Sequence, residues 1–353
     1  IDLGQMAVDG TVALTTNGNG AATIVNDAGL SFAASTVGGA LSATATNGDI
    51  TDSGNLTITG AATFITRDAG SNIVLDSSGN AFSNSVEMRA DAGGEAFGNI
   101  TFVDSAGIVF ATSAGSNGDL YINSSTDGTV GGNLSVKATT GNITDTVALA
   151  ISGTSSFTTS ATNGTIALNT PAALSGAVTL NTTGASGNAT IDNGTTALNI
   201  AASTIGGNLT VTSGAAAGIT DSGTVTVAGN LVATTDDNNG VIDLGTTTVT
   251  GTMDLTTNGS GNVTIDNGTS DIVLIASGIG GNLTLTSGNV AGITDTGTVT
   301  VAGNLVATTD AGNGVIDLGT TTVTGTMDLT SDGSGNVTID NDTSDIVLIA
   351  SEI

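Results

Sequence analysis

The sixteen-residue segment VIDLGTTTVTGTMDLT occupies positions 241–256 and recurs without change at 315–330, so its two copies are offset by 74 positions. The similarity extends further, because segments 241–278 and 315–352 differ at only four of 38 positions. Repetition at a fixed spacing is typical of arrays in which each unit is stable only when it packs on its neighbours. The chain is therefore expected to fold as a stack of units rather than around one central core.

Two short phrases measure the repeat independently. The phrase VGGAL begins at 37, VGGNL at 130 and IGGNL at 205 and 279, which gives spacings of 93, 75 and 74. The phrase ITD followed by Ser or Thr begins at 50, 143, 219 and 293, with spacings of 93, 76 and 74. The longest spacing exceeds 74 by 19, about a quarter of the repeat. This predicts coils about 18–20 positions long, four coils in each 74-residue repeat, and about 19 coils in the chain.

The residues between these phrases alternate in a way that indicates short strands. Val, Ile, Leu and Ala alternate with Thr, Ser and Asn, the pattern of a strand with one buried face. Gly and Asn stand where corners are needed, and the chain holds a single proline, Pro171. We therefore predict an all-β parallel β-solenoid, in which stacked coils about 4.8 Å apart satisfy one another's backbone groups. About 19 coils would make a rod on the order of 90 Å long.

The domain organisation follows from the repeats. A sandwich or propeller is expected to show longer strands and aromatic anchors, whereas aromatic residues are 2% of this chain. All seven Phe lie at or before Phe157, so the N-terminal part is the more diverged. We predict one solenoid over 1–353, with diverged coils at 1–165 and successive repeat copies at 166–240, 241–314 and 315–353, the last incomplete.

The charge excludes several classes of function. Acidic residues number 31 against three basic ones, a formal net charge of −28, which disfavours binding to nucleic acid or to an anionic membrane. No 18-residue apolar run exists to span a membrane as a helix. His and Cys are absent, so there is no imidazole base, thiolate or His/Cys metal site. We predict that the chain is not an enzyme and has no cofactor.

Several phrases resemble the shaft repeats of filamentous-haemagglutinin-type bacterial adhesins. They are STVGGALSATATNGDITDSGNLTITGAATF (35–64), GTVGGNLSVKATTGNITDTVALAISGTSSF (128–157) and STIGGNLTVTSGAAAGITDSGTVTVAGNL (203–231). The resemblance covers nearly the whole chain and concerns the shaft, not a receptor-binding head. It implies a right-handed parallel β-helix on the bacterial cell surface or outside the cell, exported across the outer membrane by a dedicated partner.

Two features leave a binding function open, a third would suit an enzyme, and a fourth is weak evidence for any function. Asp-rich turns at 234–240 and 308–314 offer oxygen ligands for Ca²⁺, although solvated turn aspartates are the simpler interpretation. Thr-x-Thr pairs such as TVT at 224 and 248 resemble ice-binding arrays, but Thr is also an ordinary outward strand residue. Carboxylate pairs could serve glycoside hydrolysis, yet the three cations, Arg67, Arg89 and Lys137, are scattered and form no cationic cleft. The Asn-x-Ser/Thr sequences have the form of N-glycosylation acceptors, but they follow from Gly-Asn corners that precede Thr-bearing strands.

The termini keep the phase of the repeat. IDLG at 1–4 matches 242–245, and DIVLIASEI stops at 353 where DIVLIASGI at 271–279 runs on into the next coil. We therefore expect the rod to continue, either in the same polypeptide or by end-to-end contact with another copy. The residues expected at such a contact are Ile1, Asp2, Leu3, Ile346, Leu348 and Ile353.

A long acidic rod without catalytic groups would act by its shape. The favoured function is that of a bacterial extracellular structural protein, either the shaft of a large adhesin or the subunit of a surface filament. The alternative is a binding module that presents a face for ice, glycan or Ca²⁺ on the same rod.

Overall fold

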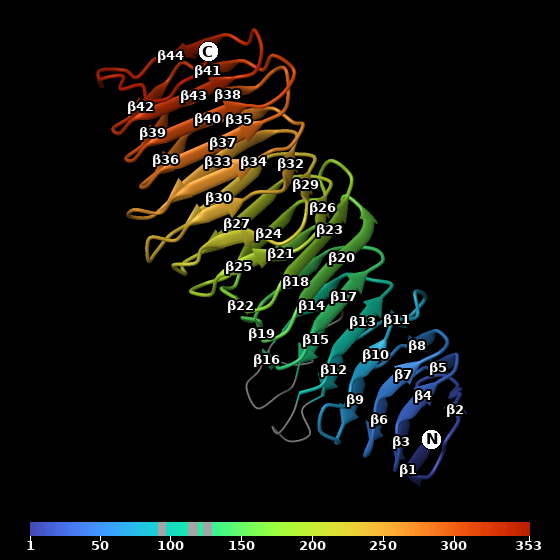
Figure 1. Cartoon of the computed structure of the whole chain (residues 1–353). Helices are drawn as coiled ribbons and strands as arrows, with labels where there is room; N and C mark the ends of the chain where they lie inside the picture. The colour runs from blue at the N-terminus through green and yellow to red at the C-terminus, as the bar shows by residue number, and fades with distance from the viewer. Residues whose placement is uncertain (91–96, 112–118, 123–128) are drawn as a thin grey trace. The chain divides into compact units, whose positions relative to one another are not determined.

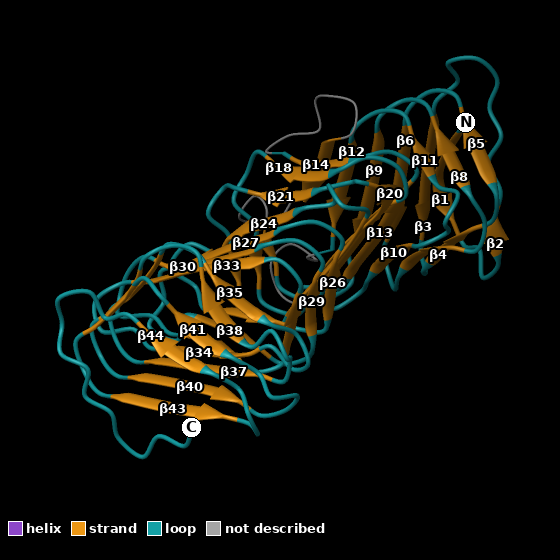
Figure 2. Cartoon of the chain, turned by 90° about the horizontal axis from the view of Figure 1, so that it is seen from above, coloured by secondary structure: helices purple, strands orange, loops and turns teal. Residues whose placement is uncertain are grey.

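The computed structural model describes residues 1–90, 97–111, 119–122 and 129–353, which form short strands and no helix (Figures 1 and 2). In consequence, no helix long and apolar enough to cross a membrane is found in this part of the chain. The chain divides into two compact units, Ile1–Gly176 and Ala177–Ile353. The expectation of one continuous solenoid over 1–353 stays a prediction.

Strand alternation produces the core of the second unit. In β27 (Leu209–Ser213), Leu209 and Val211 are buried while Thr210 and Thr212 face outward. The strand pairs in parallel with β30 (Leu231–Thr235), so that Leu209 lies under Leu231 and Val211 under Ala233. Inward residues therefore form ladders along the stack. The predicted parallel β-solenoid is confirmed.

The coil is longer than predicted. After β30 come two three-residue strands, β31 (Ile242–Leu244) and β32 (Thr247–Val249), and then β33 (Thr252–Thr257), which stacks on β30. One coil is thus one long strand plus two short ones. The solenoid has about 22 residues per coil and about 14 turns, so the prediction of 18–20 per coil and 19 coils is wrong.

The error came from averaging unequal spacings. The long strands of the last repeat begin at Val263, Leu283, Leu305 and Met327, spaced 20, 22 and 22 positions apart, but the next strand begins at Val337, only 10 positions later. This short step carries the chain to another side of the coil. The 74-residue repeat therefore makes about three and a half turns at about 22 residues per coil, not four.

As a result, residues 74 apart lie on different sheets. Met253 of β33 stacks on β30, whereas Met327 of β43 (Met327–Ser331) stacks on β40 (Leu305–Thr309) in the other large sheet of this unit. Both methionines are fully buried in the same local sequence. A repeat copy thus keeps its environment while it moves to another side of the solenoid. We call the 10-residue step from Met327 to Val337, and the equivalent step from Met253 to Val263, a side switch.

The 93-residue spacing exceeds 74 because the first unit has additional residues between two stacked strands. The register partners Ile100 and Leu134 are 34 positions apart, whereas their counterparts Val263 and Leu283 are 20 positions apart. Four of the additional residues, Asp119–Ile122, form β15, a strand that pairs with both β12 and β14 and has no counterpart between Val263 and Leu283.

The first unit contains two large and two small stacks of parallel strands. The strands of one large stack are β1 (Asp2–Met6), β3 (Ala22–Asn26), β6 (Leu41–Ala45), β9 (Ala62–Thr66), β12 (Val86–Arg89), β14 (Ile108–Phe110), β15 (Asp119–Ile122), β18 (Ile143–Asp145) and β21 (Ile166–Leu168). Those of the other are β2 (Thr11–Val12), β4 (Leu30–Phe32), β7 (Ile50–Asp52), β10 (Ile73–Leu75), β13 (Ile100–Asp104), β17 (Leu134–Ala138) and β20 (Ser155–Thr162). One small stack contains β5 (Ser35–Val37), β8 (Leu56–Ile58) and β11 (Ala81–Phe82). The other contains β16 (Thr129–Val130), β19 (Ala150–Ile151) and β22 (Ala173–Leu174).

The second unit contains two large sheets. The first holds β24 (Ala189–Asp192), β27, β30, β33, β35 (Ile272–Leu274), β36 (Ser277–Ile279), β38 (Ile293–Asp295), β39 (Val299–Val301), β41 (Ile316–Leu318), β42 (Thr321–Val323) and β44 (Val337–Ile339). The second holds β23 (Val178–Thr183), β25 (Leu198–Ile200), β26 (Ser203–Ile205), β28 (Ile219–Asp221), β29 (Val225–Val227), β31, β32, β34 (Val263–Asp266), β37 (Leu283–Ser287), β40 and β43.

Aromatic packing distinguishes the core of the first unit. The rings of Phe32 and Phe64 pack edge to face at 6.3 Å, Phe64 and Phe82 at 6.1 Å, and Phe82 and Phe102 are tilted at 5.1 Å. These four side chains are buried inside successive coils. The diverged N-terminal sequence therefore adds a stack of aromatic rings to the aliphatic ladders of the core.

Candidate functional site

The asparagine of the GGNL phrase forms a ladder along a corner of the coil. The Asn262 Oδ1 accepts a hydrogen bond from the backbone N–H of Asn282 at 2.8 Å, and the Asn282 Oδ1 accepts one from the N–H of Asn304 at 2.8 Å. The preceding glycine leaves room for this bond, because a Cβ on Gly281 would lie 2.4 Å from the Asn262 Oδ1. The first repeated phrase therefore holds one coil on the next.

The aspartate of the ITD phrase has a similar role at another corner. The Asp295 Oδ1 accepts from the N–H of Gly319 at 2.8 Å, and its Oδ2 accepts from the N–H of Thr320 at 2.9 Å. Asp145 accepts in the same way from the N–H groups of Asn169 and Thr170. Burial raises the pKa of Asp145 in spite of these bonds, which act in the opposite direction. The second phrase is thus also a coil-to-coil tie.

A third recurring polar residue marks each side switch. Asn267 follows β34 directly and is fully buried. Its Oδ1 accepts from the N–H of Val249 at 2.7 Å, and its Nδ2 donates to the carbonyl oxygens of Val249 at 3.0 Å and Asp271 at 2.6 Å. Val249 ends β32, and among the described residues no further strand stacks on it in the direction of Asn267. The side-chain amide therefore takes the place of a peptide group from a missing strand.

Sequence reasoning did not single out this asparagine. Asn341 repeats the arrangement on Val323, with its Oδ1 accepting from the N–H at 2.7 Å and its Nδ2 donating to the carbonyl at 3.1 Å. The signal that could have found it is the segment TIDN, which ends at 193, 267 and 341. A buried Asn at the end of an alternating strand requires a backbone partner.

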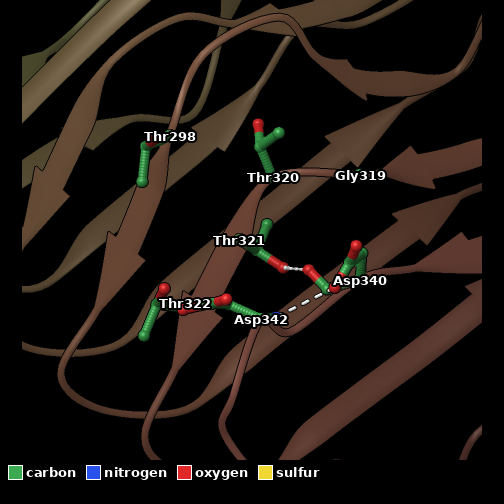
Figure 3. Close-up of a pocket in the computed structure, with 7 residues that line it drawn as sticks. All are labelled: Thr298, Gly319, Thr320, Thr321, Thr322, Asp340 and Asp342. Atoms are coloured by element: carbon green, nitrogen blue, oxygen red, sulfur yellow. Dashed lines mark hydrogen bonds between the residues drawn. The ribbon is translucent and has the colours of Figure 1, made fainter.

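One hollow among the described residues lies in the second unit and is shallow and polar (Figure 3). It has a volume of about 280 Å³ and is lined by Thr298, Gly319, Thr320, Thr321, Thr322, Asp340 and Asp342. Thr321 points toward Asp340 and donates from its Oγ1 to the Asp340 carbonyl oxygen at 2.8 Å, while the Asp340 Oδ1 accepts from the N–H of Asp342 at 3.0 Å. Hydroxyl and carboxylate groups here could hydrogen-bond a small polar ligand or water.

The polar groups of the Asp-rich turns bond the turn itself and the preceding coil. In the 234–240 turn, the Asp237 Oδ1 accepts from the N–H of Asn238 at 2.8 Å, and the Asn238 Nδ2 donates to the Gly214 carbonyl at 2.7 Å. Within the described part of the chain, no three acidic side chains come together as a group that could hold a metal ion. Ca²⁺ binding remains a prediction without a located site.

Outward threonines form one regular column on the first sheet of the second unit. Thr212, Thr234 and Thr256 are register partners on successive coils. The neighbouring column on the same strands contains Thr210, then Val232, then Asp254, so the paired Thr array does not continue. Burial raises the pKa of Asp254, whereas its hydrogen bond with Thr256 lowers it.

The predicted end-to-end residues lie on the first and last coils. Ile1 is 50% exposed and its N-terminal amine donates to the Ala21 carbonyl, while Asp2 and Leu3 of β1 pair with β3. Ile346, Leu348 and Ile353 are 50, 50 and 71% exposed. Their counterparts one repeat earlier are at most 2% exposed; these are Ile272, Leu274 and Ile279. Contact with another copy at these residues stays a prediction.

The three cations lie on separate elements of the first unit. Arg67 is exposed directly after β9, Arg89 ends β12, and Lys137 lies on β17 beside Val103 of β13. They do not form one cationic cluster in the part of the structure that is described.

Comparison with known proteins places the chain in a repeat family. No curated protein and no solved structure matches it. Residues 19–89, 98–181, 186–237 and 260–322, together more than half of the chain, match the family described as Repeats of unknown function (DUF5649). Because the match covers more than half of the chain, the chain belongs to the DUF5649 repeat family.

Proposed function

We propose that this chain is a non-catalytic bacterial extracellular structural protein, the shaft of a large adhesin or the subunit of a cell-surface filament. One observation carries the proposal: the recurring polar groups are used to hold coil on coil. Asn262, Asp295 and Asn267 represent three repeated positions, and the side chain of each bonds the backbone of an adjacent coil. Groups used in this way stabilise a shaft and are not free for chemistry.

The side switch also favours a spacing role over a ligand face. A ligand that binds a regular array needs the same residues on one side over many coils. Here each repeat copy moves to another sheet, as Met253 and Met327 do. A spacer needs only a constant coil rise, which the switch leaves unchanged. The resemblance to filamentous-haemagglutinin-type shafts agrees with this role.

The alternative is a binding module for ice, glycan or Ca²⁺, and two features favour it. The column of Thr212, Thr234 and Thr256 is regular, and the hollow beside Thr321 and Asp340 presents hydroxyl and carboxylate oxygens. Each feature spans fewer residues than one 74-residue repeat, so neither presents the same residues over many coils.

Two measurements on the full chain separate these functions. Calorimetric titration with CaCl₂ and with neutral and acidic oligosaccharides should give only heats of dilution, and ice crystals grown in its presence should stay round. Saturable heat or faceted ice would favour the binding module. Location is tested by brief proteolysis of intact cells of the encoding bacterium: a surface shaft releases peptides of this chain before lysis, whereas release only after lysis contradicts the proposal.

A further inference from the structure

Two asparagine–glycine pairs lie close together in the 241–314 repeat. Asn258 precedes Gly259 in the turn after β33, and Asn267 precedes Gly268 at the side switch. In such a pair the backbone nitrogen of the glycine can attack the side-chain carbonyl carbon of the asparagine, because glycine has no side chain to hinder the approach. The attack closes a succinimide ring and releases ammonia. Water then opens the ring to give aspartate or isoaspartate.

Asn258 is available for this reaction in the folded chain. Its side chain is exposed, and among the described residues its side-chain amide makes no hydrogen bond. The next repeat has Asp332 and Gly333 at these two positions, and both glycines have a left-handed φ, of 59° and 65°. The turn therefore accepts the aspartate that the reaction would produce.

Asn267 is held away from the reaction by the same bonds that close the side switch. Its Oδ1 accepts from the N–H of Val249 at 2.7 Å and its Nδ2 donates to two carbonyl oxygens, so its amide cannot turn toward the backbone. The attacking nitrogen is also held, because the Gly268 N–H donates to the Asp266 Oδ1 at 2.9 Å. A carboxylate at this position disfavours loss of the proton from the nitrogen, which must precede the attack.

The same position in two other repeats supports this contrast. The Gly194 N–H donates to the Asp192 Oδ1 at 2.9 Å, and the Nδ2 of the buried Asn193 donates to two carbonyl oxygens. In the last repeat Asn341 is followed by Asp342, whose side chain hinders attack by its nitrogen. The repeats therefore contain two protected asparagine–glycine pairs and one natural control.

We propose that Asn267 and Asn193 are conditional deamidation sites: each is inert while its side switch is closed and reacts when the switch opens. The reaction makes the opening irreversible. An aspartate at 267 can still accept from the N–H of Val249, but it can no longer donate to the carbonyl oxygens of Val249 and Asp271. Isoaspartate also adds a methylene group to the backbone. The inference does not depend on the proposed structural role.

Storage of the full chain at pH 8, folded and in a urea concentration that unfolds it, tests the proposal. Digestion with pepsin at low pH and tandem mass spectrometry then show which side-chain amides have become acids. In urea, Asn258 and Asn267 should react at similar rates, and Asn341 should react more slowly. In the folded chain Asn258 should still react, whereas Asn267 and Asn193 should react roughly tenfold or more slowly than in urea, because only the open fraction can react.

Thr247→Val opens the side switch without changing the reacting pair. The buried Thr247 Oγ1 donates to the Asp266 carbonyl oxygen at 2.8 Å and lies 3.3 Å from the Asn267 Oδ1. Loss of this hydroxyl should speed the reaction of Asn267 in the folded chain by about threefold or more and leave the rate at Asn258 unchanged.

Asn267→Asp tests whether the reaction holds the switch open. Hydrogen exchange at the Val249 amide at pH 7.5 should show protection roughly tenfold below that of the wild type. Equal rates at Asn267 in the folded chain and in urea would overturn the proposal. So would Thr247→Val that raises the rates at Asn258 and Asn267 equally or changes neither, or unchanged Val249 protection in Asn267→Asp. If Thr247→Val does not fold, the comparison of folded and unfolded wild type still decides.

Discussion

Replacement of Asn267 by Ala should be one of the most damaging single changes on a polar residue of this chain. The change removes the partner of both the N–H and the C=O of Val249, which is fully buried. A buried backbone group left without a partner costs about 1–3 kcal/mol, so two such groups predict a loss of about 2–6 kcal/mol. The Asp271 carbonyl also loses its bond, but this residue is half-buried and water can replace the amide.

Asn262→Ala is the matched control, because it removes the same side chain five residues earlier. Asn262 is exposed and bonds only one backbone N–H, that of Asn282, so its loss should cost about 0.5–1.5 kcal/mol. Urea unfolding followed by circular dichroism gives the two losses, and hydrogen exchange at Val249 shows whether the damage is local. If the two variants lose equal stability, Asn267 does not act as the missing peptide group.

Three further changes test other parts of the fold. Asp342 has a left-handed φ of 50° where the previous repeat has Gly268 at 53°. Asp342→Gly should therefore raise the free energy of unfolding in urea by about 0.5–1 kcal/mol. An unchanged free energy of unfolding would argue against backbone strain at Asp342. Phe64→Ala removes a fully buried ring from the aromatic stack and should cost about 3–5 kcal/mol by the same assay, so a loss below about 1 kcal/mol would show that the core collapses around the gap. Deletion of 241–314 joins Gly240 to Val315, which has the sequence context of Val241. The shortened chain should therefore keep its far-UV circular dichroism per residue and melt within a few degrees of the parent chain. Aggregation of the shortened chain would show that the repeat is not an independent unit.

The fold class was predictable because every level of the sequence agrees on it. Alternation as in LTVTS specifies a strand with one buried face, and β27 has that burial pattern. Gly-Asn corners specify tight turns, and the corner asparagines bond the adjacent coil. The ITD and GGNL phrases were correct markers of the repeat because each contains a side chain that ties two coils together.

The coil length was not predictable from the same spacing. Dividing 74 by four assumes equal units, but the step from Met253 to Val263 is half a coil while the step from Val263 to Leu283 is nearly a whole one. The switch depends on one buried asparagine whose partner, Val249, lies on the preceding coil. The segment TIDN marks this Asn in the sequence, but it does not identify Val249 as the partner until the stacking of coils is known.

The switch explains why the verbatim repeat has a period of 74 and not 22. In the second large sheet of the second unit, the short strands β26, β29 and β32 stack on one another, and Asn267 closes this run of three on Val249. The stack β36–β39–β42 also contains three strands, and Asn341 closes it on Val323. A duplication of one coil would add a fourth strand and alter the distance to the closing asparagine. A duplication of the whole 74-residue repeat instead copies three complete coils with their closing step, so every strand at both junctions meets the neighbour it had before. The repeat is therefore 74 residues long because this is the shortest segment that includes both a run of three short strands and the asparagine that closes it.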